Sequence, residues 1–450
     1  MQIITGNGND RVIRPVLDAQ GRVIRSSDTI STNGGDDTIN PGLGNYEYVY
    51  GGDGFDHLII DYSIGDTGTG MTFSSNSSNS YTRRYVSDTN YGWLDEVTTT
   101  SIEQYTITGT RKDDFFDLAT PNSTIKAGAG NDWVRVYNPI AGNIGNLDGG
   151  EGIDHLYLDL SNQTINLNFT NPLNINIAGV VKATNFEKFE LRTGSGNDTF
   201  LQSGIVNGVV LRANDTLYTN NGNDTINAGL GTDYVFAGAG IDHLIVDYSV
   251  GDTGSGMQFN GSSFYGTASR TVSSTSTTIL DSVVFTGVEQ FTVIGTSKND
   301  TIYTVAGNDI INAGAGNDLI RGGAGGDILT GGLGADTFQY QSYSDSLLSN
   351  FDVIKDLAIG VDAIDGPRAI SAAQIKKLGY VSNLTETAIQ QTLTPTNFVV
   401  NGASTFRFRD GLSDRTFLAL NDSRAGFSAS TDSIIEITRF TGNLNSLSIV

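Results

Sequence analysis

Aspartate residues recur at intervals of nine in two parts of the chain, and an apolar residue follows each of them two positions later. The two groups are Asp215, Asp224, Asp233 and Asp242, and Asp300, Asp309, Asp318, Asp327 and Asp336. Carboxylates are preferred ligands of hard divalent cations. Asn-Asp and Gly-Asp are also ordinary turn residues, but a turn needs no fixed period over so many copies. The spacing therefore predicts a ladder of cation ligands.

The second group lies in a glycine-rich segment, INAGAGNDLIRGGAGGDILTGGLGADTF at residues 311–338. Several glycines within a few residues favour a tight turn with inward carbonyl groups, a conformation that residues with a Cβ resist. The residues after each aspartate form a short strand whose middle side chain faces the core. Two nonapeptides then complete one coil, so equivalent turns are 18 residues apart. The expected stacked pairs are Asp300/Asp318, Asp318/Asp336, Asp309/Asp327, Asp215/Asp233 and Asp224/Asp242.

The pattern Gly-Gly-x-Gly-x-Asp-x-U-x, with U apolar, resembles the RTX (hemolysin-type) calcium-binding nonapeptide repeat. The resemblance implies a parallel β-roll that binds several Ca²⁺ ions, each held by two carboxylates and by turn carbonyl groups. It also implies that these carbonyl ligands come from Gly314, Gly316, Gly331 and Leu333 at one site, and from Val305, Gly307, Gly322 and Ala324 at the Asp309/Asp327 site. Roughly five such ions would reduce the formal charge to about −13.

Further copies of the motif end at aspartates without an obvious partner 18 residues away, and each is as consistent with a turn residue as with a ligand. They are Asp10, Asp37, Asp56, Asp114, Asp132, Asp154 and Asp198. In the first array Tyr46 stands near the position where an aspartate is expected. The sequence therefore predicts a degenerate site there.

Three related insertions separate the short repeats. The first and third run from GDGFDHLIIDYS to SIEQYTITGTRKDD and from GAGIDHLIVDYS to GVEQFTVIGTSKND, and the middle one is shorter. In each, a glutamate (Glu103, Glu187 or Glu289) precedes the closing aspartate by eleven residues. Alternating apolar residues indicate strands. We interpret the insertions as wider coils of the same solenoid, similar to the extended inserts of large RTX surface proteins.

The three histidines, His57, His155 and His243, share one position, Gly-x-Asp-His-Leu. This invites a catalytic or transition-metal interpretation, but the residue after the repeat aspartate points outward and tolerates histidine. The zinc-protease motif His-Glu-x-x-His is absent, which argues against a serralysin-type protease domain. No room remains for the separate catalytic module of the alginate epimerases that carry similar repeats.

Two further features bear on carbohydrate chemistry. Asp159 and Glu187 are a candidate carboxylate pair for glycoside hydrolysis, but their counterparts recur in every insertion, which favours a structural role. Aromatic residues that could stack on sugar rings are Tyr81, Tyr85, Tyr91 and Trp93, although packing is the commoner role of such side chains.

The nine-residue rhythm stops after Phe338. The following segment, with Asp352, Asp356, Asp362 and Asp365, resembles the closing segment of RTX rolls, where these residues would support a last ion or solvate the edge. A capping box at Ser371 and Gln374 with a stop at Gly379 predicts a helix, and residues 384–393 predict a second. TFRFR and RTFLALN predict a hairpin, followed by the strand SIIEITRF.

The last hundred residues resemble the bluetail domain of cyanobacterial surface proteins. As a cap, this segment would cover the open solenoid end. The chain closes with Leu-Ser-Ile-Val, a pattern typical of uncleaved type I secretion signals. At the other end the repeat begins at Thr5 without a cap, which favours end-to-end self-association.

Composition narrows the remaining classes of function. The 49 acidic and 26 basic residues give a formal charge of −23, which disfavours nucleic acid and anionic lipid as partners. No cysteine is present, so disulfides and thiolate metal sites are excluded. The N-terminus has neither a basic region nor an apolar run of a Sec signal, and no apolar stretch predicts membrane insertion.

We therefore expect an all-β fold: a parallel β-roll or β-helix solenoid with wider inserted coils, closed by a small mixed α+β C-terminal cap. RTX repeats are expected at 1–57 (degenerate), 114–155, 198–243 and 300–343, extended insert coils at 58–113, 156–197 and 244–299, and the bluetail-like cap with its secretion signal at 344–450.

The function expected from these features is that of a non-enzymatic, calcium-binding protein, exported by type I secretion and located extracellularly or at the cell surface. Its β-roll would fold on extracellular calcium. The alternative is a carbohydrate-binding or polysaccharide-modifying protein that uses the solenoid face, with cell-surface polysaccharide as its partner. A third class, an adhesin or ice binder with a threonine face, lacks a Thr-x-Thr ladder at nine-residue spacing.

Overall fold

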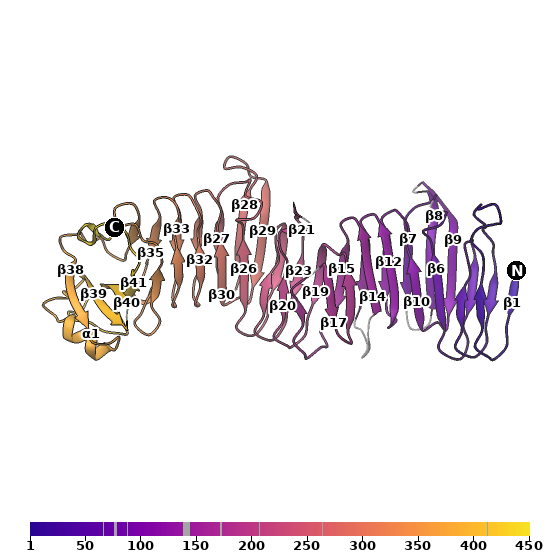
Figure 1. The fold of residues 1–450 in the computed structure, drawn as a ribbon, viewed down its shortest axis with the longest axis horizontal. Coiled ribbons are helices and arrows are strands. Elements are labelled where there is room, and N and C mark those ends of the chain that lie inside the picture. The colour runs from indigo at the N-terminus through magenta and orange to yellow at the C-terminus, as the bar shows by residue number, and fades with distance from the viewer. Residues whose placement is uncertain are drawn as a thin grey trace. The chain divides into compact units, whose positions relative to one another are not determined.

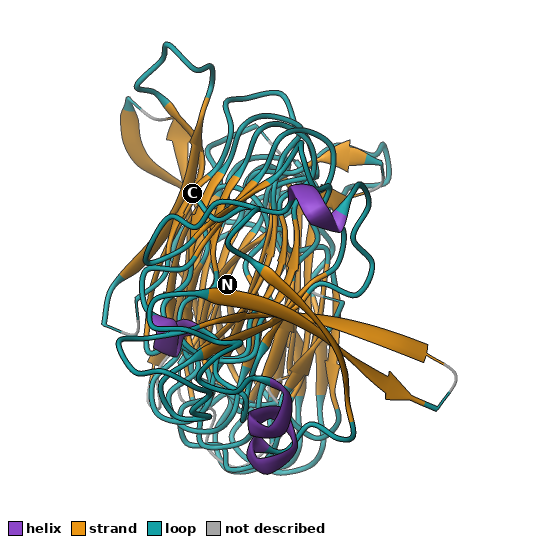
Figure 2. Ribbon diagram, turned by 90° about the vertical axis from the view of Figure 1, so that its left-hand side faces the viewer, coloured by secondary structure: helices purple, strands orange, loops and turns teal. Residues whose placement is uncertain are grey.

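A computed structural model describes residues 1–65, 67–75, 79–87, 89–137, 145–171, 173–206, 208–262, 264–411 and 413–450. The chain forms two compact units. Unit 1 comprises residues 1–202 and 214–220, and unit 2 comprises residues 203–213 and 221–450. Strands make up nearly all the regular structure, and helices are few (Figure 2).

Unit 1 is built from two long sheets, which we call sheets 1A and 1B. Sheet 1A contains, in order of pairing, β1 (Gln2–Ile4), β3 (Thr29–Ser31), β5 (Glu47–Tyr50), β9 (Asn90–Thr100), β8 (Asn79–Ser87), β7 (Met71–Ser75), β11 (Phe115–Leu118), β13 (Trp133–Val136), β15 (His155–Asp159), β19 (Lys188–Arg192) and β23 (Thr216–Tyr218). Sheet 1B contains β2 (Arg11–Ile13), β4 (Thr38–Asn40), β6 (His57–Asp61), β10 (Gln104–Thr108), β12 (Ser123–Ala129), β14 (Gly145–Glu151), β18 (Val181–Thr184) and β17 (Asn174–Ile177). A short pair, β16 (Asn168–Phe169) and β20 (Thr199–Leu201), completes the unit.

Unit 2 repeats this plan with sheets 2A and 2B, whose strands follow one another in Figure 1. Sheet 2A contains β25 (Thr232–Phe236), β29 (Ile279–Thr286), β28 (Gly266–Thr271), β27 (Gln258–Asn260), β31 (Thr301–Tyr303), β33 (Leu319–Arg321), β35 (Thr337–Gln339) and β37 (Ala363–Asp365). Sheet 2B contains β24 (Thr225–Asn227), β26 (His243–Asp247), β30 (Gln290–Ile294), β32 (Ile310–Asn312), β34 (Ile328–Thr330), β36 (Asp352–Ile354), β41 (Ser433–Glu436), β40 (Ser413–Leu420), β39 (Ala403–Asp410) and β38 (Lys376–Val381). A two-stranded hairpin, β21 (Ile205–Val206) and β22 (Val209–Val210), lies apart from both sheets.

The coil length follows the nonapeptide period. Ile302 pairs in parallel register with Ile320, and Ile320 with Phe338, each 18 residues further along the chain. These middle residues are fully buried, while their neighbours on either side are partly exposed. The parallel roll with two nonapeptides per coil is therefore confirmed, because alternation places every second side chain in the core.

The inserts differ from simple wider coils. In the first, β8 runs antiparallel to both β7 and β9, while β9 pairs in parallel with β5 and β7 with β11. The third insert has the same arrangement in β27, β28 and β29. The first and third inserts thus add an antiparallel strand to sheets 1A and 2A, and in the middle insert β17 runs antiparallel to β18 in sheet 1B. The expectation of wider coils did not include these antiparallel strands.

The glycine turns are required by the close approach of successive coils. Gly332 has φ of 100°, and a Cβ at this position would lie 1.9 Å from the carbonyl oxygen of Gly314 in the coil before it. Gly334, with φ of 141°, would meet the carbonyl oxygen of Gly316 at 1.5 Å. Only glycine combines this backbone conformation with this spacing.

The C-terminal segment continues sheet 2B, because β36 pairs in parallel with β41. The β39–β40 hairpin, the strand β41 and the helix α1 (Glu386–Thr392) lie where the sequence predicts them. The predicted helix at 371–379 is wrong: Ser371 and Gln374 form an isolated turn, and β38 follows. The C-terminal segment also contains two short 3₁₀ helices, η1 (Tyr343–Asp345) and η2 (Leu444–Ser446).

The cap has its own hydrophobic core, which packs α1 and the segment before β39 against the hairpin. Its buried members are Val381, Ile389, Leu393, Phe398, Phe406, Phe417, Ala419, Phe427 and Ile434. This cluster supports the mixed α+β cap, since it covers the strands that extend the last coil.

Replacing Gly332 by alanine tests the turn argument. We expect Gly332→Ala to lower the free energy of unfolding in calcium by roughly 3 kcal/mol, because backbone strain and overpacking act together. The control is Gly379→Ala, where nothing lies within 4 Å of the added Cβ. Denaturant unfolding should leave this control within about 0.5 kcal/mol of the parent. Equal losses for both variants would contradict the close-approach explanation.

Candidate metal centre

The repeat aspartates lie at the ends of the turns, directly before the strands, with their side chains turned inward. Asp300, Asp309, Asp318, Asp327 and Asp336 are all buried, so the stack forms part of the interior. The two sheets contribute alternate aspartates to these turns. Asp300, Asp318 and Asp336 precede strands of sheet 2A, and Asp309 and Asp327 precede strands of sheet 2B.

Each of these carboxylates is joined to the preceding coil by one hydrogen bond. The backbone N–H of Asp300 donates to Oδ1 of Asp318 at 2.8 Å, and that of Asp318 donates to Oδ1 of Asp336 at 3.0 Å. On the opposite edge the N–H of Asp309 donates to Oδ1 of Asp327 at 2.9 Å. In Asp318, Asp327 and Asp336 Oδ1 therefore accepts from a main-chain donor of the coil before, and the side chains form a ladder. Asp300 differs, because its Oδ1 accepts from the N–H of Met257 and its Oδ2 from the N–H of Thr296.

The second carboxylate oxygen has a different environment. Oδ2 of Asp318 and Oδ2 of Asp327 are buried and have no hydrogen-bond partner in the part of the chain that the structure describes. The same holds for Oδ2 of Asp56, Asp132, Asp154 and Asp242. A buried carboxylate without a compensating charge is strongly unfavourable. The ladder thus presents a column of oxygens suited to a cation.

The inserts show how the chain itself neutralises a buried carboxylate. Asp281 is fully buried and pairs with the fully buried Arg270 at 2.7 Å and with Arg212 at 2.8 Å. In the first insert, Asp95 pairs in the same way with Arg84 and with Arg25. Among the described residues, no lysine or arginine forms an ion pair with a ladder aspartate of residues 300–336.

Burial raises the pKa values of several ladder aspartates. Desolvation raises the pKa of Asp132 to about 8 and the pKa values of Asp318 and Asp327 to about 7. It raises the pKa values of Asp154 and Asp242 to about 6. Neighbouring carboxylates act in the same direction, because two like charges in one column disfavour ionisation.

The oxygens around the ladder fit a calcium ion. Calcium takes six to eight oxygen ligands from carboxylates and carbonyl groups. Within the described residues, no group of three or more acidic, histidine or cysteine side chains is placed to hold a metal ion. That main-chain carbonyl groups of the turns supply the other ligands stays a prediction.

Several of the carbonyl groups predicted as ligands also accept hydrogen bonds. The Gly314 carbonyl accepts from the N–H of Leu333, and the Leu333 carbonyl from the N–H of Gly316. Val305 and Ala324 form the equivalent bridge on the other edge, and Gly322 accepts from the Thr304 hydroxyl. A carbonyl oxygen has two lone pairs, so the second remains for a cation. The assignment of all eight carbonyl groups, those of Gly307, Gly316 and Gly331 included, stays a prediction.

Two predicted pairs remain, Asp224/Asp242 and Asp215/Asp233. The first lies within unit 2, and the second has one member in each unit. The N–H of Asp224 donates to Oδ1 of Asp242 at 2.8 Å within unit 2. Asp215 belongs to unit 1, where its Oδ1 accepts from the N–H of Phe189 at 2.7 Å, whereas Asp233 belongs to unit 2.

The isolated aspartates also form the ladder, and the expectation that they lack a partner 18 residues away is wrong for Asp114 and Asp132. Asp114 and Asp132 are 18 residues apart, and the N–H of Asp114 donates to Oδ1 of Asp132 at 2.7 Å. Asp132 is joined in the same way to Asp154, 22 residues further on, and Asp37 to Asp56, 19 residues further on. Coils of unequal length thus keep the contact although they break the period. Asp10 joins Asp37, and Asp198 accepts from Leu167.

The recurring glutamates of the inserts take the place of an aspartate in this ladder. Glu103 accepts from the N–H of Asp56 at 2.8 Å, Glu187 from that of Asp154 at 2.9 Å and Glu289 from that of Asp242 at 2.9 Å. Their constant position in the inserts was visible in the sequence, but their role was not.

Two ladder residues of the first array were missed. Asp28 was not recognised, and its N–H donates at 2.9 Å to Glu47, which is fully buried. Tyr46 is exposed and has a positive φ. The acidic residue of this coil is Glu47, one residue after Tyr46. A one-residue insertion displaced it from the period.

The segment after the last repeat extends the ladder. Asp352 accepts from the N–H of Asp327 at 2.9 Å and Asp362 from that of Asp336 at 3.0 Å. Asp356 accepts from the N–H groups of Gly331 and Gly332. Asp365 accepts from the Gln339 side chain.

The histidines have neighbours that differ between the inserts. Nε2 of His57 lies 2.8 Å from the Thr106 hydroxyl, and Nε2 of His243 lies 2.9 Å from that of Thr292. His155 instead stacks on Trp133, and burial lowers its pKa to about 4.

Comparison with known proteins identifies the repeat. A family model of the RTX calcium-binding nonapeptide repeat matches in four copies, at residues 25–46, 212–244, 292–320 and 303–338. RTX nonapeptide repeats bind Ca²⁺, and proteins with them are typically secreted and are structural or toxin-associated. The matches end at residue 338, and the likeness of the C-terminal segment to a bluetail domain stays a prediction.

No curated protein matches the chain. In the described residues, no helix is long and apolar enough to cross a lipid bilayer.

The raised pKa values of the buried carboxylates predict that the stability of the calcium-free chain depends on pH. Between the unfolded pKa of about 4 and the folded values of about 6 to 8, the folded state binds more protons, so its stability falls as pH rises. We expect the calcium-free chain to lose more than about 2 kcal/mol of stability from pH 5 to pH 8. Thermal melts by circular dichroism in calcium-depleted buffers measure this. Stability that is constant or rises over this interval would contradict the buried-carboxylate description.

Proposed function

We propose that this chain, which carries RTX calcium-binding nonapeptide repeats, is a secreted structural or surface protein whose β-roll folds on extracellular calcium after type I secretion. The observation that carries the proposal is the column of buried carboxylate oxygens without partners, represented by Oδ2 of Asp318 and Asp327. Such a column favours unfolding unless a cation enters it, since each charge repels the next.

The proposed ligands are the ladder carboxylates together with the turn carbonyl groups next to them. They are Asp300, Asp309, Asp318, Asp327 and Asp336 with Val305, Gly307, Gly314, Gly316, Gly322, Ala324, Gly331 and Leu333, and Asp215, Asp224, Asp233 and Asp242 in the earlier group. Calcium binds here in preference to magnesium, because a shell of carboxylates and carbonyls in flexible turns suits the larger ion.

Calcium concentration then couples folding to compartment. The cytosol holds little calcium, so the ladder stays charged and the chain stays unfolded, as export through a narrow channel requires. Outside the cell calcium is abundant, and binding that occurs only in the folded state stabilises that state by mass action.

The role is non-enzymatic. The carboxylate pair considered for hydrolysis has structural partners: Oδ1 of Asp159 accepts from the N–H of Ser161 at 3.0 Å, and Glu187 accepts from Asp154 in the ladder. The counterparts Asp61 and Asp247 accept from Ser63 and Ser249 in the same way. A pattern repeated in every insert serves the coil and not one reaction.

Calcium removal from the full chain tests the proposal. We expect a β-type circular dichroism signal with a high melting temperature in millimolar calcium, a weaker signal with a much lower melting temperature in EDTA at pH 8, and recovery of both when excess calcium is added. Magnesium at the same concentration serves as the control and should restore little signal. A chain that is equally folded and melts equally in EDTA and calcium refutes the proposal.

Removing one ladder charge should have opposite effects in the two conditions. Asp318→Asn keeps an acceptor for the N–H of Asp300 but removes the buried charge. We expect lower stability than the parent in calcium, by roughly 2–4 kcal/mol, and equal or higher stability in EDTA at pH 8.

The matched control is Asp410→Asn, which removes the same charge at an exposed hairpin end. It should change stability by less than about 0.5 kcal/mol in both conditions. A loss of stability for Asp318→Asn in EDTA as large as in calcium would show that the side chain acts through its hydrogen bond alone.

A further inference from the structure

The outward face of sheet 1A carries an unusual concentration of aromatic and arginine side chains. Both tryptophans of the chain, Trp93 on β9 and Trp133 on β13, lie on it. We call this surface the aromatic face. Its aromatic members on the described strands are Tyr48, Tyr50, Tyr81, Tyr85, Trp93, Phe115, Trp133, His155, Tyr157 and Tyr218, with Tyr137 directly after β13. The side chain of Tyr91 lies outside the described residues.

The rings lie in ordered rows along neighbouring strands. Tyr85 stacks on Trp93 with centroids 4.6 Å apart, and Trp133 stacks on His155 at 5.1 Å with the planes 10° apart. Phe115 meets the edge of Trp133 at 5.4 Å. Such packing holds the rings in fixed orientations, which lowers the entropy lost when a ligand binds them.

Three arginines lie among the rings, and the guanidinium of Arg192 lies 4.0 Å from the Tyr218 centroid. The guanidinium of Arg83 lies 4.2 Å from the Tyr81 centroid and 4.9 Å from that of Trp93. The guanidinium of Arg135 lies 4.7 Å from the Tyr137 centroid. Each arginine therefore places hydrogen-bond donors beside flat apolar rings, the combination that recognises a sugar ring by its apolar face and its hydroxyl groups.

The fold does not require these side chains. Sheet 1B presents mainly polar side chains at the outward positions of its described strands, together with Ile13 and Ile59, and no phenylalanine, tyrosine or tryptophan there. The roll therefore does not need aromatic rings on its outer face; sheet 2A carries fewer of them than sheet 1A, with Tyr234 and Phe236 on β25 and Tyr303 on β31.

The third insert provides an internal comparison. At the offset of 186 residues it retains the buried pair of Arg84 and Asp95 as Arg270 and Asp281. The outward residues Tyr81, Arg83, Tyr85 and Trp93 are replaced by Thr267, Ser269, Thr271 and Ile279. The interior is retained while the rings at these positions are lost, although Phe264 and Tyr265 are exposed elsewhere in the third insert. The fold of the insert therefore does not depend on the rings of Tyr81, Tyr85 and Trp93.

The charges of the aromatic face are balanced. Arg83, Arg135, Lys188 and Arg192 are accompanied there by Glu96, Asp117, Asp159 and Glu190. Arg83 is paired with Glu96 at 2.8 Å. A face without net charge on a chain with a formal charge of −23 gives an anionic polymer no attraction and favours a neutral one.

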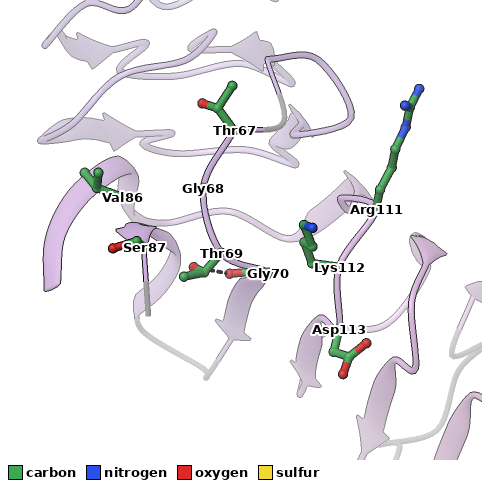
Figure 3. A pocket seen from close by; sticks show the side chains of 9 residues that line it. All are labelled: Thr67, Gly68, Thr69, Gly70, Val86, Ser87, Arg111, Lys112 and Asp113. Carbon is green, nitrogen blue, oxygen red and sulfur yellow. Dashed lines mark hydrogen bonds between the residues drawn. The ribbon is translucent and has the colours of Figure 1, made fainter. Parts of the chain in front are cut away.

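A polar cavity lies at the end of β8, directly after Tyr85. It has a volume of about 450 Å³ and is lined by Thr67, Thr69, Val86, Ser87, Lys112 and Asp113 together with neighbouring residues (Figure 3). Hydroxyl, ammonium and carboxylate groups suit the hydroxyl groups of a sugar, whereas a surface for self-association would bury an apolar pocket instead.

We propose that the aromatic face binds a neutral polysaccharide, whose successive sugar rings stack on Tyr81, Tyr85, Trp93 and Trp133 while Arg83 and Arg135 donate to its hydroxyl groups. Parallel strands lie 4.7–4.9 Å apart, a spacing comparable to the length of one sugar unit in an extended chain. The rows of rings can therefore contact several units of one polymer. The binding surface is distinct from the ladder, so its test is independent of the calcium proposal.

Tryptophan fluorescence tests this directly, because both tryptophans lie on the aromatic face. Full-length protein in calcium is titrated with three soluble neutral polysaccharides, hydroxyethyl cellulose, galactomannan and dextran. We expect a saturable change in emission with at least one of them. We expect Trp133→Ala and Trp93→Ala each to weaken binding by roughly tenfold in affinity gel electrophoresis, as removal of a stacking ring does.

Two further variants separate stacking from folding. Trp133→Phe retains a flat ring and should keep most of the binding, and Ile279→Ala alters the position in the third insert that corresponds to Trp93 and should leave binding unchanged. Calcium-dependent circular dichroism confirms that each variant folds. The proposal is overturned by no binding to any of the three polymers, by unchanged affinity of the Trp→Ala variants, by binding to dextran sulfate alone, or by rings that prove to mediate self-association instead.

Discussion

The structure depends on the different environments of the two oxygens of a buried ladder carboxylate such as that of Asp318. One oxygen accepts a hydrogen bond from the main chain of the preceding coil, as Asp318 does from Asp300, and this contact sets the alignment of one turn on the next. The other oxygen of Asp318 has no partner within the described residues. The same side chain that orders the coil therefore places an uncompensated charge inside it. Stacking and cation binding are for this reason one property of the roll, since the ladder that aligns the turns is the ladder that needs an ion.

The chain uses two different cations for the same electrostatic problem. In the first and third inserts a buried guanidinium, Arg84 or Arg270, is supplied by the chain and also donates to carbonyl groups of the adjoining loop. In the first roll Asp28 pairs with Arg14 and with the N-terminal amino group, whereas the ladder from Asp300 to Asp336 has no such ion pair among the described residues, and we propose that its cation is calcium. A guanidinium is always present, whereas calcium is present only in some compartments. The buried charges of the first and third inserts are thus balanced within the chain, and the proposed response to calcium rests on the rolls between them.

The two related inserts also separate what the scaffold requires from what it tolerates. Between them the buried arginine, its aspartate partner and the ladder glutamate are retained, while the outward residues change from aromatic to small polar and aliphatic ones. Because alternate residues of a strand face opposite sides, the outer face varies without effect on the core. This independence is what the recognition surface proposed for sheet 1A requires.

The strict period of nine was sufficient by itself to determine the all-β class, the coil of two nonapeptides and the inward stack from Asp300 to Asp336, because a constant period in sequence becomes a constant step in space. It could not determine contacts that coils of unequal length preserve, such as Asp132 with Asp154, or the acid at Glu47 beside Tyr46. Local signals also failed at Ser371–Gly379, where a capping pattern predicted a helix and the edge of β39 recruits β38. In each case the deciding interaction joins residues far apart in the chain, and only the folded coils bring them within hydrogen-bond distance.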